Sequence, residues 1–322
     1  MTRISQNITG WILTEGMAGT ENQCIGVAEA LGLTPDIKRV QLRRPWKWLS
    51  PPLLKAHSGA FDPPLEAPWP DLLIASGRKS VLASLFIKRQ SRGKTFTVQI
   101  QDPKISSRHF DLVAVPYHDD LRGDNVIVTD GAPNKVTDER LQEGREKFGP
   151  ALSHLPAKKA AVLIGGKSKA FEMTQDDTQE LALQLKTLID KHNIGLMITA
   201  SRRTGPQNMR ILRDILKGDH IYFWDGRGEN PYFGFLALAD YILVSQDSVS
   251  MTSEAASTGK PVYIVPLSGG SRRINKFHRH LCDKNVVKEF DGKLQKWSYK
   301  PLNDSQIIAN EINRCLITRK AG

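Results

Sequence analysis

The sequence predicts an α/β protein with two doubly wound domains that face each other across a cleft. Three observations predict this fold class. Short apolar runs of strand length alternate with segments of helical periodicity along the whole chain, which is typical of parallel sheets covered by helices. This alternation occurs twice, and each time the first strand runs into two glycines, Gly16 with Gly19 and Gly165 with Gly166. The length of 322 residues suits two domains.

The first half of the chain supplies the elements of one domain in order. Its strands are short runs rich in β-branched and other apolar residues. We expect them at 11–14, 37–42, 72–75, 95–100, 112–115 and 126–128. A helix is expected over 22–31, where apolar side chains recur at helical spacing before Gly32 ends it.

The second half repeats the pattern. Its expected strands are 160–164, 196–199, 221–224, 241–244 and 262–265. Its expected helices are 175–191, 210–216, 236–239, a short helix that starts near Ser248 and a terminal helix at 302–317. Gly, Pro and basic residues gather at 149–156. We therefore expect an N-terminal domain at 1–152, a C-terminal domain at 153–301, and a final helix at 302–322 that packs back on the first domain.

The charge balance indicates an anionic partner. Lys and Arg number 45 against 34 Asp and Glu, a net charge of +11, which favours a nucleotide or an anionic membrane surface. We expect no nucleic-acid binding, because acids are interspersed with the basic residues outside 38–55. That segment contains RRPWKW, which is either a membrane-surface contact or a plain exposed loop.

Cysteine usage and hydropathy predict a cytoplasmic protein. The 3 cysteines lie far apart, which excludes a disulfide framework and suits a reducing compartment. No run approaches the roughly 20 apolar residues of a membrane span, and the polar first ten residues lack the core of a secretory signal. At most, we expect attachment to the inner face of the cytoplasmic membrane.

The most informative segment is 246–266, a short helix between two apolar runs. Asp247 and Ser248 are suited to capping the first backbone N–H groups of that helix. A helix N-terminus that follows a strand favours anions, because its unpaired N–H groups and its dipole are positive. Met251 and Glu254 follow within the helix, and the glutamate can bind a sugar diol. The segment predicts a nucleoside-diphosphate site, or else an ordinary unit of the fold.

Further motifs follow three other strands of the second half. Each one alone is as often a turn or a solvated loop as a binding site. They are Gly165, Gly166, Lys167 and Ser168, then Ser201, Arg202, Arg203 and Thr204, and then Trp224, Asn230 and Pro231. Because the carboxyl ends of parallel strands meet at one edge of a sheet, these motifs together predict one nucleotide site. Glycine N–H groups and cations would bind the phosphates there.

The first half offers candidates for acid–base chemistry. His118 beside Asp119 can take a proton from an attacking hydroxyl, and Glu15 is the alternative base. A His–Asp pair is also often purely structural. The candidates for the acceptor-side loops at this edge are Gly16, Gly19, Gln23, Gly77, Arg78 and Asp102. The loop lacks the G-x-G-x-x-G pattern and no acid follows the second strand, which argues against a nicotinamide enzyme.

With these motifs, the chain resembles the mitochondrial fission "elongated mitochondria" (ELM) family. The resemblance runs over nearly the whole length. It is carried by Gly16, Gly19 and Gln23, by SGR at 76–78, QIQDP at 99–103, PYHDD at 116–120, LIGGKSK, SRRT, NPY at 230–232, DSVSMTSEA and GKPVY. Eukaryotic members of the family help to recruit a dynamin-like protein to the mitochondrial outer membrane, and no residue of this sequence encodes that role.

The second half also resembles the donor domain of GT-B glycosyltransferases, such as the lipid-linked N-acetylglucosamine transferase of cell-wall synthesis. The resemblance implies two Rossmann-like domains. It implies that Gly165, Gly166 and Ser248 contact phosphates and that Glu254 binds the ribose. The chain departs from that enzyme in its first loop, where no histidine follows the glycines. The identity of the catalytic base therefore stays open.

Together these observations predict a glycosyltransferase that takes a sugar from a nucleoside-diphosphate donor. The acceptor is expected at the membrane or in a cell-envelope glycan. Arginines and a helix N-terminus would neutralise the departing diphosphate, so we expect neither a metal nor a cofactor besides the nucleotide-sugar substrate. The alternative is a catalytically inactive adaptor that binds a protein partner at a membrane surface. The oligomeric state stays open.

Overall fold

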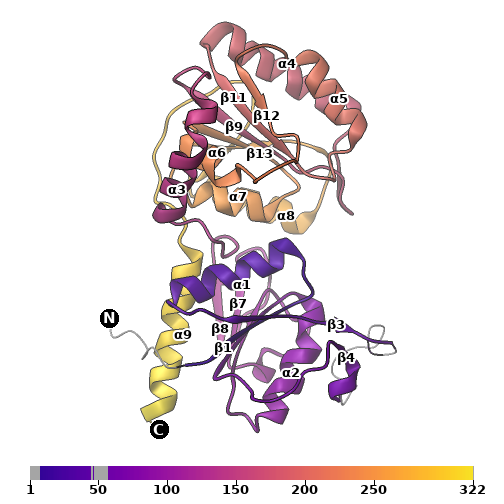
Figure 1. Cartoon of the computed structure of the whole chain (residues 1–322), viewed down its shortest axis with the longest axis vertical. Helices are drawn as coiled ribbons and strands as arrows, with labels where there is room; N and C mark the ends of the chain where they lie inside the picture. The colour runs from indigo at the N-terminus through magenta and orange to yellow at the C-terminus, as the bar shows by residue number, and fades with distance from the viewer. Residues whose placement is uncertain (1–7, 45, 47–56, 322) are drawn as a thin grey trace. The chain divides into compact units, whose positions relative to one another are not determined.

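The structure is a computed structural model that describes residues 8–44, 46 and 57–321, and it confirms the α/β fold class (Figure 1). The chain forms two compact units. The N-terminal unit comprises Met1–Lys135 together with Asn303–Gly322, and the C-terminal unit comprises Val136–Leu302. Each unit contains one six-stranded sheet whose neighbouring strands are all parallel.

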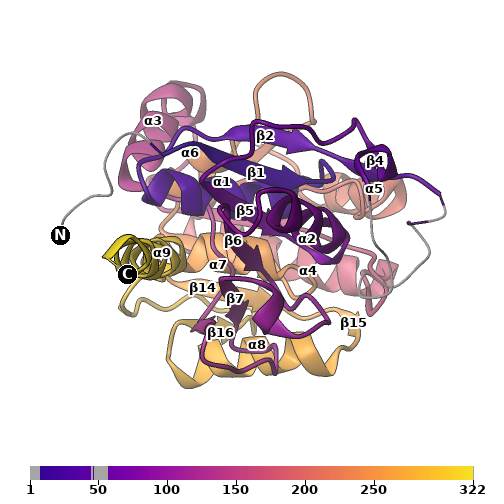
Figure 2. The same cartoon turned by 90° about the horizontal axis from the view of Figure 1, so that it is seen from below.

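The sheet of the N-terminal unit has the strand order β2-β1-β5-β6-β7-β8, and Figure 2 shows β2, β1, β5, β6 and β7 following one another. Its strands are β1 (Gly10–Thr14), β2 (Asp36–Arg39), β5 (Leu72–Ser76), β6 (Phe96–Ile100), β7 (Leu112–Pro116) and β8 (Val126–Thr129). Three of them, β5, β6 and β7, are buried along their whole length, which explains their continuous apolar character. The strand order reverses between β1 and β5.

Three α-helices among the described residues cover the faces of this sheet. They are α1 (Ala18–Ala30), α2 (Val81–Gln90) and α9 (Asp304–Ala321). Helices α1 and α9 bury one face, where Val27 of α1 and Ile308 and Ile312 of α9 share an apolar cluster with β1, β5, β6 and β7. Helix α2 and the short antiparallel pair β3 (Gln41–Leu42) and β4 (Phe61–Asp62) cover the other face. The carboxylate of Asp304 anchors α9 by accepting the backbone N–H groups of Asp130 and Gly131.

The sheet of the C-terminal unit has the order β12-β11-β9-β13-β14-β16. Its strands are β9 (Lys159–Ile164), β11 (Gly195–Ala200), β12 (Ile221–Phe223), β13 (Tyr241–Ser245), β14 (Val262–Val265) and β16 (Val287–Glu289). Numbered along the chain, this is the doubly wound order 3-2-1-4-5-6, and it reverses between β9 and β13. Ligands of such sheets bind beyond the carboxyl ends of the strands at this switch point.

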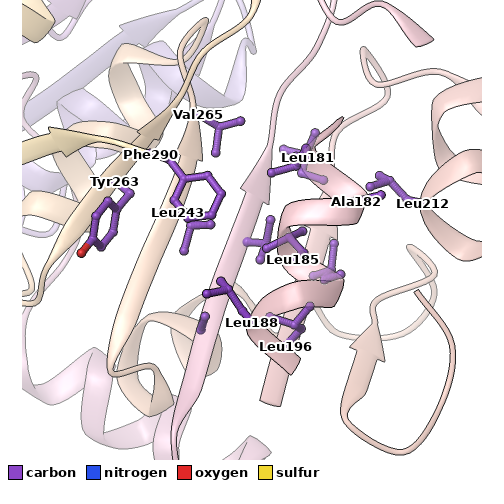
Figure 3. Close-up of a cluster of buried hydrophobic side chains, with 14 of the residues drawn as sticks. Leu181, Ala182, Leu185, Leu188, Leu196, Leu212, Leu243, Tyr263, Val265 and Phe290 are labelled. Atoms are coloured by element: carbon purple, nitrogen blue, oxygen red, sulfur yellow. The ribbon is translucent and has the colours of Figure 1, made fainter. Parts of the chain in front are cut away.

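Helices cover both faces of the second sheet. They are α3 (Asp138–Phe148), α4 (Gln175–His192), α5 (Pro206–Ile215), α6 (Tyr232–Leu238), α7 (Val249–Ala256) and α8 (Arg272–Asp283). On one face, Leu185 of α4 and Leu212 of α5 pack with Leu243 of β13 (Figure 3). On the other face, α6, α7 and α8 contribute a second cluster that includes Phe235 and Phe277. Burying one such side chain stabilises the fold by about 1.5–3 kcal/mol.

The division between the units differs from the predicted boundary at 152/153. It falls at 135/136, because α3 packs on α6 of the C-terminal unit. The two helices approach so closely that a Cβ on Gly144 would lie 2.7 Å from the Gly234 nitrogen. Arg145 of α3 also donates to the carbonyl oxygen of Ala237, at 2.7 Å. The final helix belongs to the N-terminal unit.

Sequence periodicity did not predict α2, α3 or α8. Helix α3 buries only Gly144 and so lacks a clear apolar stripe, whereas α8 has a narrow stripe of Ile274, Phe277 and Leu281 among basic and polar residues, which the prediction missed. Helix α2 buries six of its ten residues, so its sequence is apolar over a continuous run and looks like a buried strand. In the part of the chain that the structure describes, no helix is both long enough and apolar enough to cross a bilayer.

Candidate functional site

The carboxyl ends of β9 and β13 lie side by side at the switch point of the C-terminal sheet. Gly165 follows β9, and its N–H donates to Ser245 Oγ of β13 at 2.7 Å. The Ser245 hydroxyl in turn donates to Asp247 Oδ1 at 2.7 Å, and the Gly166 N–H reaches the same oxygen at 3.3 Å. A Cβ on Gly165 would lie 2.4 Å from both carboxylate oxygens of Asp247. The glycine is therefore required so that the aspartate can pack against the loop.

The loop after β11 closes on the same glycines. Ser201 Oγ and Thr204 Oγ1 both donate to the Gly165 carbonyl oxygen, at 2.5 and 2.7 Å. Arg203 forms an ion pair with Asp247, with Nη1 and Oδ2 2.6 Å apart. The Asp247 side chain is fully buried, whereas 44% of the Arg203 side chain is exposed. The pair thus holds an exposed guanidinium at the switch point.

The glycine loop does not offer its backbone N–H groups to a ligand, which corrects the sequence prediction. The N–H groups of Gly165 and Gly166 donate to Ser245 and Asp247. Those of Lys167 and Ser168 donate to the carbonyl oxygens of Arg203 and Phe171. Ser168 Oγ accepts from the N–H groups of Ala170 and Phe171, so it stabilises a local turn. The acceptors come from distant segments, and loop spacing alone cannot indicate them.

Helix α7 keeps an open N-terminus at the same edge. Ser248 is its N-cap, and its Oγ accepts from the Met251 N–H at 3.3 Å. Its carbonyl oxygen accepts from the Thr252 N–H. The first-turn N–H groups of Val249 and Ser250 take no part in these bonds and have no acceptor within the helix. With the helix dipole they form a positive end suited to an anion. Met251 itself packs against the apolar cluster of this face.

Glu254 lies further along α7 and is joined to the first residue of α6, which follows the loop after β12. Tyr232 Oη donates to Glu254 Oε2 at 2.5 Å. Burial, together with the charge of Glu254, raises the pKa of Tyr232 well above its usual value, so the hydroxyl stays protonated and donates. The Tyr232 N–H bonds to Asn230 Oδ1 at 3.1 Å, and Pro231 between them is buried. Two of the predicted motifs therefore meet.

The remaining predicted residues of this edge differ in their availability. Arg202 is exposed. Lys167 Nζ pairs with Glu172 Oε1 at 3.1 Å, and both side chains are mostly exposed. Trp224 is half-buried against the apolar cluster, and its indole N–H donates to the carbonyl oxygen of Arg227. Among the described residues, no group of three or more His, Cys, Asp or Glu side chains is placed to hold a metal.

Sequence reasoning missed two residues that shape this edge. Ser245 looked like the end of a strand, yet it connects β9 to Asp247. His278 of α8 donates from Nε2 to the Gln246 carbonyl oxygen at 2.8 Å and so holds the segment before α7. Burial lowers the pKa of His278, which favours the neutral ring. The signal for Ser245 was its position two residues before an aspartate at a strand end.

The N-terminal unit places its candidates at the carboxyl edge of its own sheet. Glu15 follows β1, and its Oε2 lies 2.5 Å from Lys79 Nζ. Asp102, after β6, pairs in the same way with Lys104. Gly16 and Gly77 both have a φ of +84°, a conformation that favours glycine. Gly19 lies in the first turn of α1, Gln23 is buried within that helix, and Arg78 is exposed.

His118 and Asp119 follow β7 and are buried, with 3% and 4% of their surface exposed. The two interpretations of PYHDD were a catalytic pair and a structural pair, and a structural pair is commonly buried to this degree. The carbonyl oxygen of Asp119 also accepts from Arg122 Nη1, at 2.6 Å. The structure brings Glu15 and the two residues of this pair to the ends of different strands of one sheet.

The fold is that of GT-B proteins. The UDP-GlcNAc 2-epimerase of Methanocaldococcus jannaschii, in complex with UDP-GlcNAc and UDP, superposes with a TM-score of 0.54. It shares 12% sequence identity, and the match covers 95% of this chain and 99% of that chain. At this identity the likeness shows the fold alone.

Sequence comparison shows the family. "Mitochondrial fission protein ELM1" of Arabidopsis thaliana is 27% identical over an alignment of 389 positions, which covers 96% of this chain and 91% of that protein. "Uncharacterized protein RP120" of Rickettsia prowazekii is 30% identical over 297 residues, with 78% of this chain and 81% of that protein covered. The family model described as mitochondrial fission ELM1 matches residues 18–316. The chain therefore belongs to the mitochondrial fission ELM1 family.

Proposed function

We propose that this protein is a glycosyltransferase that takes its donor sugar from a nucleoside diphosphate bound at the switch point of the C-terminal unit. One observation carries the proposal. At the carboxyl end of β13, the buried Asp247 holds the exposed guanidinium of Arg203 immediately before the open N-terminus of α7. A cation and a positive helix end at a switch point suit a diphosphate.

A diphosphate at this position would give the other residues of this edge roles in binding the donor. Arg202 and Lys167 would add positive charge around the diphosphate, and this charge would stabilise the leaving group as the sugar departs. Glu254 would accept hydrogen bonds from the two ribose hydroxyls, with Tyr232 holding its carboxylate in place. A UDP complex of a protein with the same fold makes uridine diphosphate the first nucleotide to test.

The catalytic base would come from the N-terminal unit. A base must reach the acceptor hydroxyl within hydrogen-bond distance, about 2.6–3.2 Å. Glu15, whose side chain is 25% exposed, meets this requirement better than His118, which is 3% exposed. We therefore assign Glu15 as the base, with His118 and Asp119 positioning the loop after β7. The acceptor would be a membrane-associated or cell-envelope glycan, and the protein would work in the cytoplasm.

A second candidate is an adaptor that has kept the fold and lost catalysis. The observation in its favour is that the N–H groups of the glycine loop, from Gly165 to Ser168, are already used within the protein. The name of the Arabidopsis relative also refers to mitochondrial fission and not to an enzyme. Its partner surface would include the basic segment at 38–55, of which residues 45 and 47–55 lie outside the described part.

Turnover of UDP-GlcNAc separates the two candidates. The protein is incubated with UDP-GlcNAc and a membrane extract, and released UDP and the intact nucleotide-sugar are followed by NMR. A transferase releases UDP and leaves a sugar on the acceptor, and Glu15→Gln abolishes this while Glu66→Gln, an exposed acid of the same unit, does not. An adaptor releases nothing. An isomerised nucleotide-sugar without released UDP would contradict transfer.

A further inference from the structure

A group of uncharged polar side chains lies at the carboxyl edge of the N-terminal sheet. It consists of Gln23, Ser76 and Gln101, and we call it the amide cluster. Gln23 Oε1 accepts from Ser76 Oγ and from Gln101 Nε2, each at 3.0 Å. The cluster thus joins α1, the end of β5 and the end of β6.

The position of the cluster is that of a ligand site. The strand order of this sheet reverses between β1 and β5. Ser76 is the last residue of β5, and Gln23 comes from the helix that follows β1. In doubly wound sheets, ligands bind beyond the strand ends at such a reversal. The N-terminal unit therefore has a switch point of its own, separate from the one in the C-terminal unit.

The cluster is rigid, and part of its hydrogen-bonding capacity is unused. Gln23 and Ser76 are 6% and 2% exposed. Gln23 Oε1 accepts two hydrogen bonds, which fixes the amide orientation, whereas Gln23 Nε2 and Gln101 Oε1 form no hydrogen bond among the described residues. Gln101 adopts a φ of +71°, which costs energy in any residue with a side chain and is retained mainly at functional sites.

The charges around the cluster indicate what kind of ligand fits. The three side chains of the cluster are uncharged, and the acids that follow β1 and β6, Glu15 and Asp102, each pair with a lysine. This differs from the C-terminal edge, where Arg203 is presented beside a positive helix end. Amide groups both donate and accept, which matches the hydroxyl groups of a sugar better than it matches a phosphate. Arg78 is exposed and lies outside the hydrogen-bonded cluster.

We infer that the amide cluster binds a neutral, hydroxyl-rich ligand, so that the acceptor is a neutral glycan rather than a phosphorylated one. This inference rests on the proposed function in one respect. The bound glycan is called the acceptor because a glycosyltransferase needs a second substrate. Gln23 Nε2 and Gln101 Oε1, which no described residue uses, would contact the sugar hydroxyls. Glu15, which follows β1 at the same switch point, would receive the proton of the reacting hydroxyl.

Saturation-transfer NMR on the full chain tests the inference. The probes are methyl β-D-glucoside and methyl N-acetyl-β-D-glucosaminide, with glucose 6-phosphate and methyl glucuronide as charged counterparts. Excess UDP occupies the nucleotide site, and its binding is measured separately by calorimetry. We expect the neutral glycosides to bind more tightly than the charged ones. Gln23→Met should weaken them at least about fivefold, the ratio that one neutral hydrogen bond supplies.

Two variants control for folding and specificity. Gln90→Met changes an exposed glutamine at the end of α2 and should leave binding unaltered. Ser76→Ala provides a smaller change in the cluster if Gln23→Met lowers the melting temperature. If UDP binds but no neutral glycoside does, if the charged probes bind better, or if Gln23→Met equals Gln90→Met, the inference is wrong and the nucleotide site stands. If glycosides bind through the cluster and UDP does not bind, the proposed donor fails instead.

Discussion

Arg203 and Asp247 form an ion pair in which the carboxylate is fully buried and the guanidinium is 44% exposed. The aspartate also accepts the Ser245 hydroxyl and the Gly166 N–H, so one carboxylate organises the ends of β9, β11 and β13. The pair is thus both a structural anchor and the source of an exposed positive charge. This double role makes its variants informative in the absence of any ligand.

Arg203→Ala should lower the free energy of unfolding by about 3 kcal/mol, because it leaves the buried Asp247 carboxylate without its cation. Arg202→Ala is the matched control. Arg202 is the adjacent exposed arginine, and its removal should change stability by no more than about 0.5 kcal/mol. Urea unfolding of both variants measures the difference. Equal effects would show that the ion pair does not stabilise the site.

Gly165→Ala should destabilise the C-terminal unit by about 1–3 kcal/mol. The new Cβ would lie 2.4 Å from the Asp247 oxygens, so the carboxylate or the loop must move. Gly270→Ala is the control, since its Cβ would have no neighbour closer than 4.0 Å. Thermal unfolding compares the two. A Gly165→Ala variant as stable as Gly270→Ala would contradict the close approach of Asp247.

Glu254 and Tyr232 should determine how well the protein recognises ribose. We expect wild type to bind UDP at least about tenfold more tightly than 2′-deoxy-UDP, because a charged hydrogen bond contributes about 1.5–3 kcal/mol. Glu254→Gln should remove most of this preference. Tyr232→Phe should reduce it partly, since the carboxylate loses the hydroxyl that orients it. Competition calorimetry measures the ratio, and an unchanged ratio in Glu254→Gln would exclude the ribose role.

Lys260 should make stability depend on pH in the alkaline range. Burial, reinforced by the charge of Arg145, lowers its pKa to about 8 from the ordinary 10.5, although its Nζ donates to the Leu236 and Ala237 carbonyl oxygens. Between these two values the unfolded chain binds more protons than the folded one, so stability rises with pH. Lys260→Met removes this contribution. The difference in unfolding free energy between wild type and variant should therefore shift by up to about 3 kcal/mol between pH 8 and 10.5. A constant difference would contradict the lowered pKa.

The sequence predicted the sheets well because their central strands are fully buried. Strands such as β5, β7 and β13 are apolar along their length, and buried parallel strands have this pattern wherever they occur. The helices were harder to predict. Helix α3 consists almost entirely of charged and polar residues, and what attaches it to α6 is the close approach of two glycines, Gly144 and Gly234. A contact of this kind leaves no periodic pattern of apolar residues in the sequence.

The candidate site, too, could be predicted only in part. Strand ends predicted which loops share an edge, and the pairing of β9 with β13 agrees with that prediction. The sequence could not show which N–H groups remain available. Gly165 and Gly166 looked like a phosphate loop, but Ser245 and Asp247 supply their acceptors from 80 residues away or more. The order of strands and loops in the sequence predicts which loops lie at one edge of a sheet. Long-range hydrogen bonds determine which groups at that edge remain available to a ligand.

Hydrogen–deuterium exchange with and without UDP tests the central claim most directly, because it locates the bound nucleotide on the chain. The account predicts slower exchange in the first turn of α7, at Val249 and Ser250, and in the loop at 201–204, with no change in the strands β5 to β7. Arg203→Ala should reduce that protection. UDP that binds without protecting α7, or that leaves exchange unchanged everywhere, would contradict a diphosphate site at the switch point.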